Sequence, residues 1–383
     1  MGEDESERVY RNGSEPDLAE ASYRKLQMRR LTIIFGLAIV TFIGMIAALS
    51  IGAVDIPFFD TAAIVINKIF FGVFGDVSNY TYNRIIADIR MPRIILCVLT
   101  GASLGMAGAI MQGLLRNPLV SPFTLGVSTA SSFGAALAIV FGTSLLGAAY
   151  YDSYLFLGQE ITIDELLKTV SAFVFGMLSI AVVIIISKRT NVSRSTLILS
   201  GVIISYIFQS GLMLTKFLSD DAQLRDITMW MMGGFSGTTW GVILIVLPIV
   251  LICGLLMEKM AVDINALSSG DDVASNLGIN VKSLRNRGLI LSTLIASTCI
   301  AFTGTIGFIG LMAPHLCRML VGNDHRYLIP ASALLGAAIL VVSDLFARII
   351  LRPSEIPVGV IMYVIGGIFF MWLVFGKKAG ESE

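Results

Sequence analysis

Ten apolar runs, separated by polar stretches, are the feature of this sequence that most limits its fold. Each is close to the length of about 20 residues that a helix needs to cross ~30 Å of hydrocarbon. The runs lie at 31–52, 93–115, 122–142, 169–187, 197–215, 240–257, 288–304, 306–321, 327–347 and 356–375. With 55% hydrophobic and 14% charged residues, the chain has too little polar surface for a water-soluble domain. The sequence therefore predicts an all-α, polytopic transmembrane bundle of about ten helices.

An even number of crossings places both termini on the same side of the membrane. Most of the 27 lysines and arginines fall on that side, which the positive-inside rule identifies as the cytoplasm. We expect a cell-membrane protein with a disordered hydrophilic tail at 1–30, a transmembrane domain at 31–376 and a short cytoplasmic tail at 377–383.

Several classes of chemistry are excluded by composition and motif. The net charge is zero, so the basic footprint of a nucleic-acid-binding protein is missing. The four cysteines stand singly and the two histidines belong to no metal-spaced cluster, so we expect neither a metal site nor a cofactor. The sequence holds no GxxxxGK[ST] phosphate loop, which excludes ATP hydrolysis by that route.

The longest connection on the cytoplasmic side, residues 258–287, is long enough for two short helices. Asp271 and Asp272 open a helical stretch, where carboxylates favour the positive end of the helix dipole. Gly278 suits the left-handed position that ends such a helix. A capped helix on this side is a candidate attachment point for a partner, and the alternative is an ordinary loop helix.

Few ionisable residues fall inside the apolar runs. Asp344 and Arg348 are one helical turn apart near the end of the ninth run and can pair. A proton- or sodium-coupled carrier is expected to keep a carboxylate at the membrane midplane, and we find none. Gly310, Pro314 and His315 read first as a structural motif, since proline kinks a helix and glycine permits close packing. For His315 the alternative is a substrate ligand.

The regions between the runs give weaker signals. We expect loops at 53–92 and 143–168, and a half-helix around Met229–Phe235. Gly108-Ala109-Ile110 and Gly304-Thr305-Ile306 resemble each other, which would suggest an inverted repeat of the kind found in transporters.

A set of short motifs gives the chain its resemblance to a known family. They are Arg90-Met91-Pro92-Arg93, Gly101-Ala102-Ser103-Leu104-Gly105, Gly108-Ala109, Gln112-Gly113, Arg116-Asn117-Pro118-Leu119, Leu125-Gly126-Val127-Ser128, Trp230 to Phe235, Leu277-Gly278, Gly307 to His315, Asp324-His325-Arg326 and Glu355 to Gly359. In order and spacing, from about 60 to 376, the chain resembles the FecCD family, permeases of importers for iron siderophores, haem and cobalamin.

The resemblance implies a type II ABC importer permease architecture. It implies a homodimer in the membrane lipid with the substrate path at the two-fold axis, two cytoplasmic ATPase subunits and an extracytoplasmic substrate-binding protein. It also implies three sites. The ATPase-coupling loop would contain Ser269, Gly270, Asp271, Asp272, Leu277 and Gly278. The cytoplasmic gate would be Ser193, Arg194 and Ser195, and the binding protein would dock on Arg90, Arg93 and Arg348.

From residues and resemblance together, we expect a permease that imports metal chelates with energy from a separate ATPase. The first rival is an ion-coupled secondary transporter, which would need a proton or sodium gradient. The second is an intramembrane enzyme, which would need a catalytic dyad or metal cluster. The shared motifs do not separate cobalamin from iron chelates as substrate.

Overall fold

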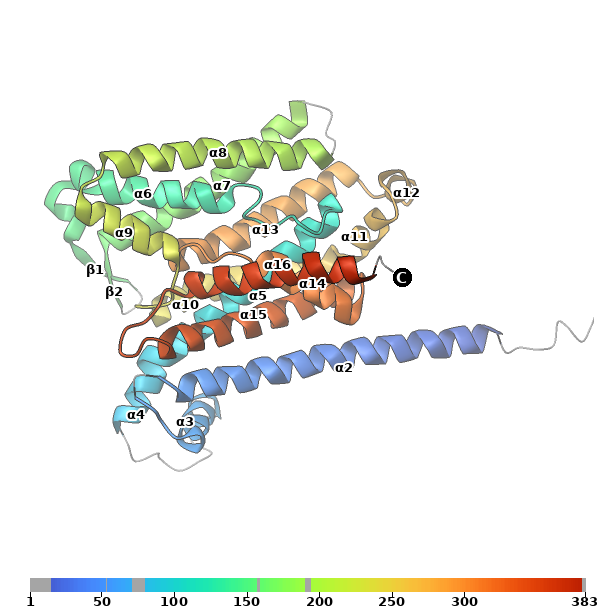
Figure 1. Cartoon of the computed structure of the whole chain (residues 1–383), viewed down its shortest axis with the longest axis horizontal. Coiled ribbons are helices and arrows are strands. Elements are labelled where there is room, and N and C mark those ends of the chain that lie inside the picture. Colours follow the sequence, from blue (N-terminus) through green and yellow to red (C-terminus); the bar gives the residue numbers. More distant parts are fainter. Residues whose placement is uncertain (1–14, 53, 71–79, 157–158, 190–193, 381–383) are drawn as a thin grey trace, which may run out of the picture.

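Helices make up nearly all of the computed structural model, which describes residues 15–52, 54–70, 80–156, 159–189 and 194–380. Within these ranges ten helices run along the long axis of the molecule (Figure 1). They are α2 (Glu15–Ser50), α5 (Met91–Leu115), α6 (Val127–Leu146), α7 (Ile163–Arg189), α8 (Arg194–Leu218), α10 (Trp240–Lys259), α13 (Val281–Thr303), α14 (Ile309–Val321), α15 (His325–Ile349) and α16 (Val358–Gly380).

Nine of these helices are long and apolar enough to cross a membrane, and the tenth, α14, has 13 residues. The stretch before it, 304–308, is not helical yet lies almost wholly buried in the bundle. Irregular backbone is tolerated at membrane depth only where protein covers it. The predicted all-α bundle of about ten helices is confirmed.

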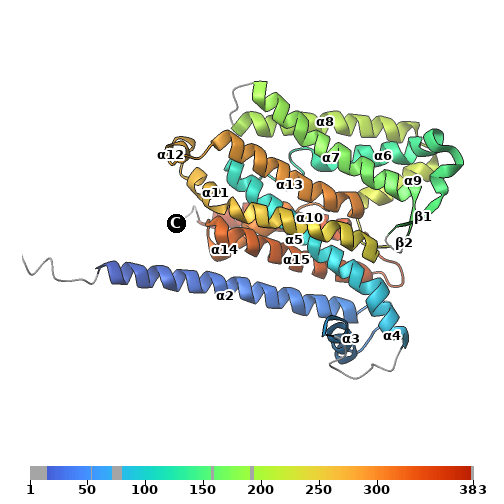
Figure 2. The same ribbon diagram turned by 180° about the vertical axis from the view of Figure 1, so that it is seen from behind.

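The two ends of the bundle differ. The end that we call the terminal end holds the start of α2, the end of α16 and two short helices, α11 (Ala261–Ser268) and α12 (Asp271–Asn276) (Figures 1 and 2). The opposite end, the hairpin end, holds α3 (Phe58–Phe70), α4 (Tyr80–Arg84) and a two-stranded sheet. The described chain therefore begins and finishes at the same end, as an even number of crossings requires.

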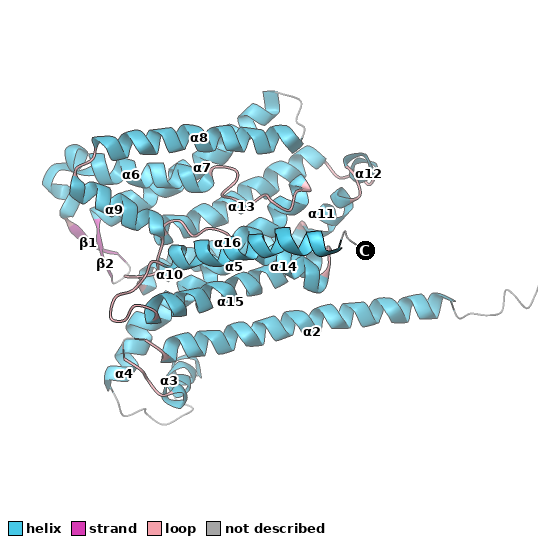
Figure 3. Cartoon of the chain, in the orientation of Figure 1, coloured by secondary structure: helices cyan, strands magenta, loops and turns pink. Residues whose placement is uncertain are grey.

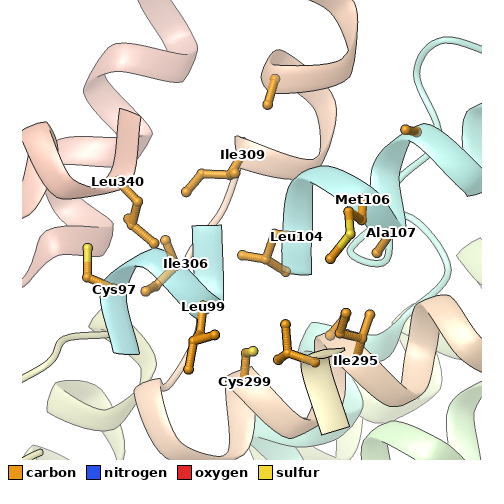
Figure 4. Packing of buried hydrophobic residues seen from close by; sticks show 14 of the residues in the cluster. Cys97, Leu99, Leu104, Met106, Ala107, Ile295, Cys299, Ile306, Ile309 and Leu340 are labelled. Atoms are coloured by element: carbon orange, nitrogen blue, oxygen red, sulfur yellow. The ribbon is translucent and has the colours of Figure 1, made fainter. Parts of the chain in front are cut away.

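Helix α5 lies at the centre of the bundle. It packs against α10, α13, α14 and α15, and its Leu104 belongs to the same hydrophobic cluster as Ile306 and Ile309 (Figure 4). Its glycines allow this approach. A Cβ added to Gly101 would lie 2.4 Å from the carbonyl oxygen of Gly336, and one added to Gly105 would lie 2.1 Å from that of Ser332. Because higher numbers on α5 meet lower numbers on α15, these two helices run antiparallel.

Helix α2 begins much earlier than we predicted. Residues 15–30, expected to belong to a disordered tail, form its first turns, while residues 1–14 lie outside the described part of the chain. Arg24 pairs with Glu20 one turn away at 2.8 Å, and Arg30 reaches Asp324 at 3.4 Å. These polar contacts extend the helix beyond its apolar run, so the predicted start of order at residue 31 is wrong.

Two expected loops contain secondary structure. In 143–168 a 3-10 turn, η2 (Gly147–Tyr151), precedes strands β1 (Ser153–Phe156) and β2 (Gln159–Thr162), which pair antiparallel with Ser153 opposite Thr162 (Figure 3). In 53–92, α4 continues through a π-helical turn, η1 (Ile85–Arg90), into α5.

The predicted half-helix and repeat have different outcomes. A short helix is present, but α9 (Asp221–Met232) begins well before Met229 because Asp220 and Gln223 form a capping box. The inverted repeat is wrong, since Gly108 of α5 meets Gly310 of α14 and Gln112 meets Arg318, so the two helices run in the same direction.

Candidate functional site

The loop of α11 and α12 is the main feature of the terminal end, joining α10 to α13 (Figure 1). The two predicted short helices are confirmed. Helix α12 begins at Asp271, and Gly278 just after it has a φ of 84°, the left-handed conformation predicted for it. Gly270, between the helices, also has a positive φ of 143°. Left-handed conformations favour glycine, so these two positions fix where α12 starts and stops.

Asp271 faces the bundle. Its two carboxylate oxygens accept hydrogen bonds from Arg285 of α13 at 2.9 and 2.8 Å, and Arg116, just after α5, lies 3.4 Å from Oδ1. Arg285 is 6% exposed and also donates to the carbonyl oxygen of Leu114 at 3.3 Å. This arrangement fastens α12 to α5 and α13.

The other side of α12 is open. Val273 is 45% exposed and Leu277 is 66% exposed, four residues apart, whereas Ala274 between them is fully buried. Of the remaining predicted coupling residues, Ser269 and Asp272 are exposed. The structure therefore separates an inward carboxylate, Asp271, from an outward surface that carries Leu277 of the predicted set and Val273, which was not predicted.

The predicted gate is only partly described. Ser193 lies outside the described residues. Arg194 is the first residue of α8, and the side chain of Ser195 is exposed.

At the hairpin end, Arg90 and Arg348 are each only 6% exposed. Arg90 donates hydrogen bonds to the carbonyl oxygens of Leu49 at 2.6 Å and Ser50 at 2.9 Å, and also to that of Val54. Arg348 donates to the carbonyls of Ala48 at 2.9 Å and Ile51 at 3.2 Å. The last carbonyls of a helix have no partner within it and carry partial negative charge. The two arginines therefore cap the end of α2.

Arg93 lies between a buried and an exposed carboxylate. It contacts Asp344, which is fully buried, at 2.9 Å and Glu355, whose side chain is 42% exposed, at 2.8 Å. Asp344 also pairs with Arg348 at 3.0 Å, which confirms the pairing predicted from their spacing. Arg90, Arg93 and Arg348 do lie at one end of the bundle, but most of their polar contacts are within the chain.

The motif around His315 packs helices together. A Cβ added to Gly108 of α5 would lie 1.9 Å from the carbonyl oxygen of Gly310, so α5 and α14 touch here. Pro314 lies inside α14 and is buried. The His315 ring stands edge-on to that of Phe369 in α16, with 5.9 Å between the ring centres. These contacts favour the structural reading of the motif.

Sequence reasoning missed a polar cluster where α2, α11 and α15 meet. Burial of Asp324 favours its neutral form, but hydrogen bonds from Arg326 and Asn265 outweigh this and lower its pKa to about 2. Asp324 therefore stays ionised and holds both partners. The Asp324-His325-Arg326 motif was visible in the sequence, but Asn265, 59 residues away, carried no signal of its own.

The part of the chain that the structure describes contains no group of three or more His, Cys, Asp or Glu side chains arranged to hold a metal ion. All four cysteines are buried there as free thiols.

Comparison with known proteins places most of the chain in one family. The FecCD transport family matches residues 39–376. The chain is similar to the hemin transport system permease protein of Yersinia pestis, at 34% identity over 77% of this chain and 84% of that protein. It is also similar to the vitamin B12 import system permease protein of Vibrio vulnificus, at 31% identity over 81% of this chain and 88% of that one.

Among solved structures, an inward-facing conformation of a metal-chelate type ABC transporter matches with a TM-score of 0.75 and 29% identity, covering 90% of this chain and 99% of the other. Family, relatives and fold agree with the motifs along the sequence. The chain therefore belongs to the FecCD transport family and is a multi-pass membrane permease of the ABC importer type.

Proposed function

We propose that this permease imports metal chelates into the cytoplasm as a homodimer, with a separate ATPase and an extracytoplasmic binding protein. The functions of its relatives support this, since they transport hemin and vitamin B12, both large metal complexes, and the similar structure is of metal-chelate type. The specific chelate is a matter for experiment, because these relatives differ in substrate at similar identity.

The proposal rests mainly on α12, which is fixed to the bundle on one side and open on the other. Asp271 fixes one side to the bundle through Arg116 and Arg285, so the helix is held in place. Val273 and Leu277 leave apolar area open on the other side, at an end of the bundle where the loop lies beyond the crossing helices. Large apolar groups in such a position favour a protein partner. We propose that this partner is the ATPase subunit and that the terminal end is cytoplasmic.

The opposite end is then the one that meets the binding protein. Docking on Arg90 and Arg348 would have to break their five hydrogen bonds to backbone carbonyls, three at the end of α2 and two just after it. Arg93 needs less rearrangement, because its outer partner Glu355 is itself partly exposed. We therefore propose that the binding protein contacts Arg93 first. Docking on Arg90 and Arg348 stays a prediction. The cytoplasmic gate at 193–195 and a substrate path on the two-fold axis are implied by the resemblance to the family. Both stay predictions.

The energy source separates this proposal from an ion-coupled carrier. Asp344, near the end of the ninth apolar run, is a buried carboxylate that pairs with two arginines, Arg93 and Arg348. A coupling carboxylate has to exchange its proton or ion with water, which this pairing opposes. The sequence also lacks a phosphate loop, so hydrolysis falls to another subunit.

Reconstitution tests these assignments together. The chain is purified with its ATPase subunit, placed in liposomes with the binding protein, and assayed for uptake of labelled cobalamin, haem and ferric siderophores. We expect uptake that needs ATP on the α12 side and persists when ionophores abolish ion gradients, and no ATP turnover by the chain alone. Uptake driven by a gradient without ATP would overturn the proposal in favour of a secondary transporter.

A further inference from the structure

We propose that Asn265 in α11 transmits movement of the α11–α12 loop to the first turn of α15. This role rests on the proposed function of the loop as the ATPase attachment. It makes Asn265 a positioning residue, one that acts by holding another element rather than by touching substrate or nucleotide.

The side-chain amide of Asn265 makes three contacts with the start of α15. Its Nδ2 donates to Asp324 Oδ1 at 2.7 Å. Its Oδ1 accepts from the backbone N–H of His325 at 2.9 Å and lies 2.8 Å from Nδ1 of the same residue. A carbonyl oxygen only accepts, so Nδ1 of His325 carries the proton here. One side chain therefore fixes the two residues with which α15 begins.

The first turn of α15 is connected in turn to α2. Asp324 caps α15 by accepting from the backbone N–H of Arg326, and it also accepts from the guanidinium of that residue at 2.7 Å. Arg30 of α2 lies 3.4 Å from the same carboxylate. A displacement of Asn265 is thus passed to a residue on which three helices converge.

His325 also forms a tight contact with α5. A Cβ on Gly113 would lie 2.4 Å from Nε2 of His325 and 2.6 Å from Cγ2 of Ile264, the residue before Asn265. Helices α5, α11 and α15 therefore meet at Gly113 without free space. Close-packed side chains transmit displacement because they cannot be compressed.

The loop thus has polar attachments to two parts of the bundle, and those to α5 include a hydrogen bond from Arg116 to the carbonyl oxygen of Leu267 in α11. Asp271 binds α12 to α5 and α13 through Arg116 and Arg285. Asn265 binds α11 to α15, and through Asp324 to α2. Since α5 and α15 pack along their length, a pull on α11 should move this pair together.

The test measures coupling rather than activity alone. Asn265→Leu keeps the approximate size of the side chain but removes all three polar contacts. In the full complex with ATPase and binding protein, we expect the variant to co-purify with the ATPase, because Val273 and Leu277 are unchanged. The amount of substrate transported per ATP hydrolysed should fall by about fivefold or more, since a typical coupling between sites begins at about that factor. Asp263→Asn, two residues earlier on α11, is the control and should keep the wild-type ratio.

A milder pair of variants covers the case in which Asn265→Leu does not fold. Asn265→Asp removes the donor to Asp324 and sets two carboxylates side by side, and it should also lower the ratio. Adding Asp324→Asn restores a donor and an acceptor with their roles exchanged, and should recover most of the loss. A merely structural role would change yield or thermal stability but not this ratio.

A wild-type ratio in Asn265→Leu, or in Asn265→Asp, would overturn the inference. Failure of the proposed function looks different, because the unmodified complex would then show no ATP-dependent uptake at all.

Discussion

Arg348 shows how this chain accommodates charge inside a membrane bundle. Its guanidinium is surrounded by the carbonyls of Ala48 and Ile51 and by Asp344. A buried cation is tolerated only with partners that replace its lost hydration. Here one partner is a full charge and the others are the negative end of a helix dipole. The arginine therefore joins α15 to α2 at the hairpin end.

Removal of this charge should weaken the bundle. Arg348→Gln removes one of the two arginines that cap the end of α2 and leaves Asp344 paired with Arg93 alone. Breaking a buried pair costs about 3 to 5 kcal/mol, so the midpoint of thermal unfolding in detergent should fall clearly. Arg352→Gln is the matched control, since its pair with Asp55 is exposed at 3.4 Å and such pairs contribute about 0 to 1 kcal/mol. Equal midpoints for the two variants would contradict the capping role.

A second residue-scale prediction concerns Gly278. Its φ is 84° and a Cβ would meet nothing within 4 Å, so any effect of substitution comes from the backbone alone. A β-branched residue in this conformation costs about 1 to 2 kcal/mol, whereas asparagine tolerates it. We expect Gly278→Val to abolish uptake with normal membrane expression, and Gly278→Asn to retain it. The assay is ATP-driven uptake in reconstituted liposomes. Normal uptake by Gly278→Val would exclude α12 orientation as a requirement.

At the scale of elements, contact between α5 and α15 depends on missing side chains. Gly101 and Gly336 face each other so closely that a Cβ on either would lie within 2.4 Å of the other's carbonyl oxygen. Small residues let helix backbones approach in lipid, where van der Waals packing drives association. The close contact between α5 and α15 therefore requires residues without a side chain at these two positions.

Gly101→Val should separate the two helices. Overpacking a close contact costs about 1 to 3 kcal/mol or more, which should show as loss of the monodisperse peak in size-exclusion chromatography after mild heating. Gly44→Ala in α2 is the control, because its Cβ would lie 3.8 Å from Val341, an ordinary contact. If both variants resist heating equally, close α5–α15 packing does not limit stability.

The parts that were predictable from sequence are those set by local chemistry. Apolar runs gave the crossings, and Asp271 and Gly278 gave the limits of α12, because caps act within one or two turns. The partners of Arg90 and Arg348 are backbone carbonyls up to 41 and 300 residues away, and carbonyls leave no mark in a sequence. The β hairpin was missed because two four-residue strands give too short an alternation to recognise.

At the scale of the whole molecule, the two ends of the bundle have different chemistry. The terminal end presents apolar side chains on a tethered helix, whereas the hairpin end presents the paired charges of Arg93 and Glu355. Charged groups at an interface speed the association of a partner that arrives and leaves. This contrast agrees with the assignment of one partner to each end.

Arg93 is the residue at which exchange of a polar partner can be tested. If a carboxylate of the binding protein replaces Glu355 on Arg93, then Glu355→Gln removes a competitor without disturbing the buried pair with Asp344. An exposed pair contributes about 0.2 to 1 kcal/mol, so affinity for the binding protein should rise by about 1.4- to fivefold, measured by titration of the transporter in nanodiscs. Glu160→Gln removes an exposed carboxylate elsewhere on the hairpin end and controls for long-range attraction, which salt screens beyond about 8 Å at 0.15 M. The gain in affinity from Glu355→Gln should therefore survive moderate salt better than the gain from Glu160→Gln.

A lower affinity in Glu355→Gln would instead mean that Glu355 itself contacts the binding protein. Equal, salt-sensitive gains in both variants would mean that Arg93 is not part of the docking contact.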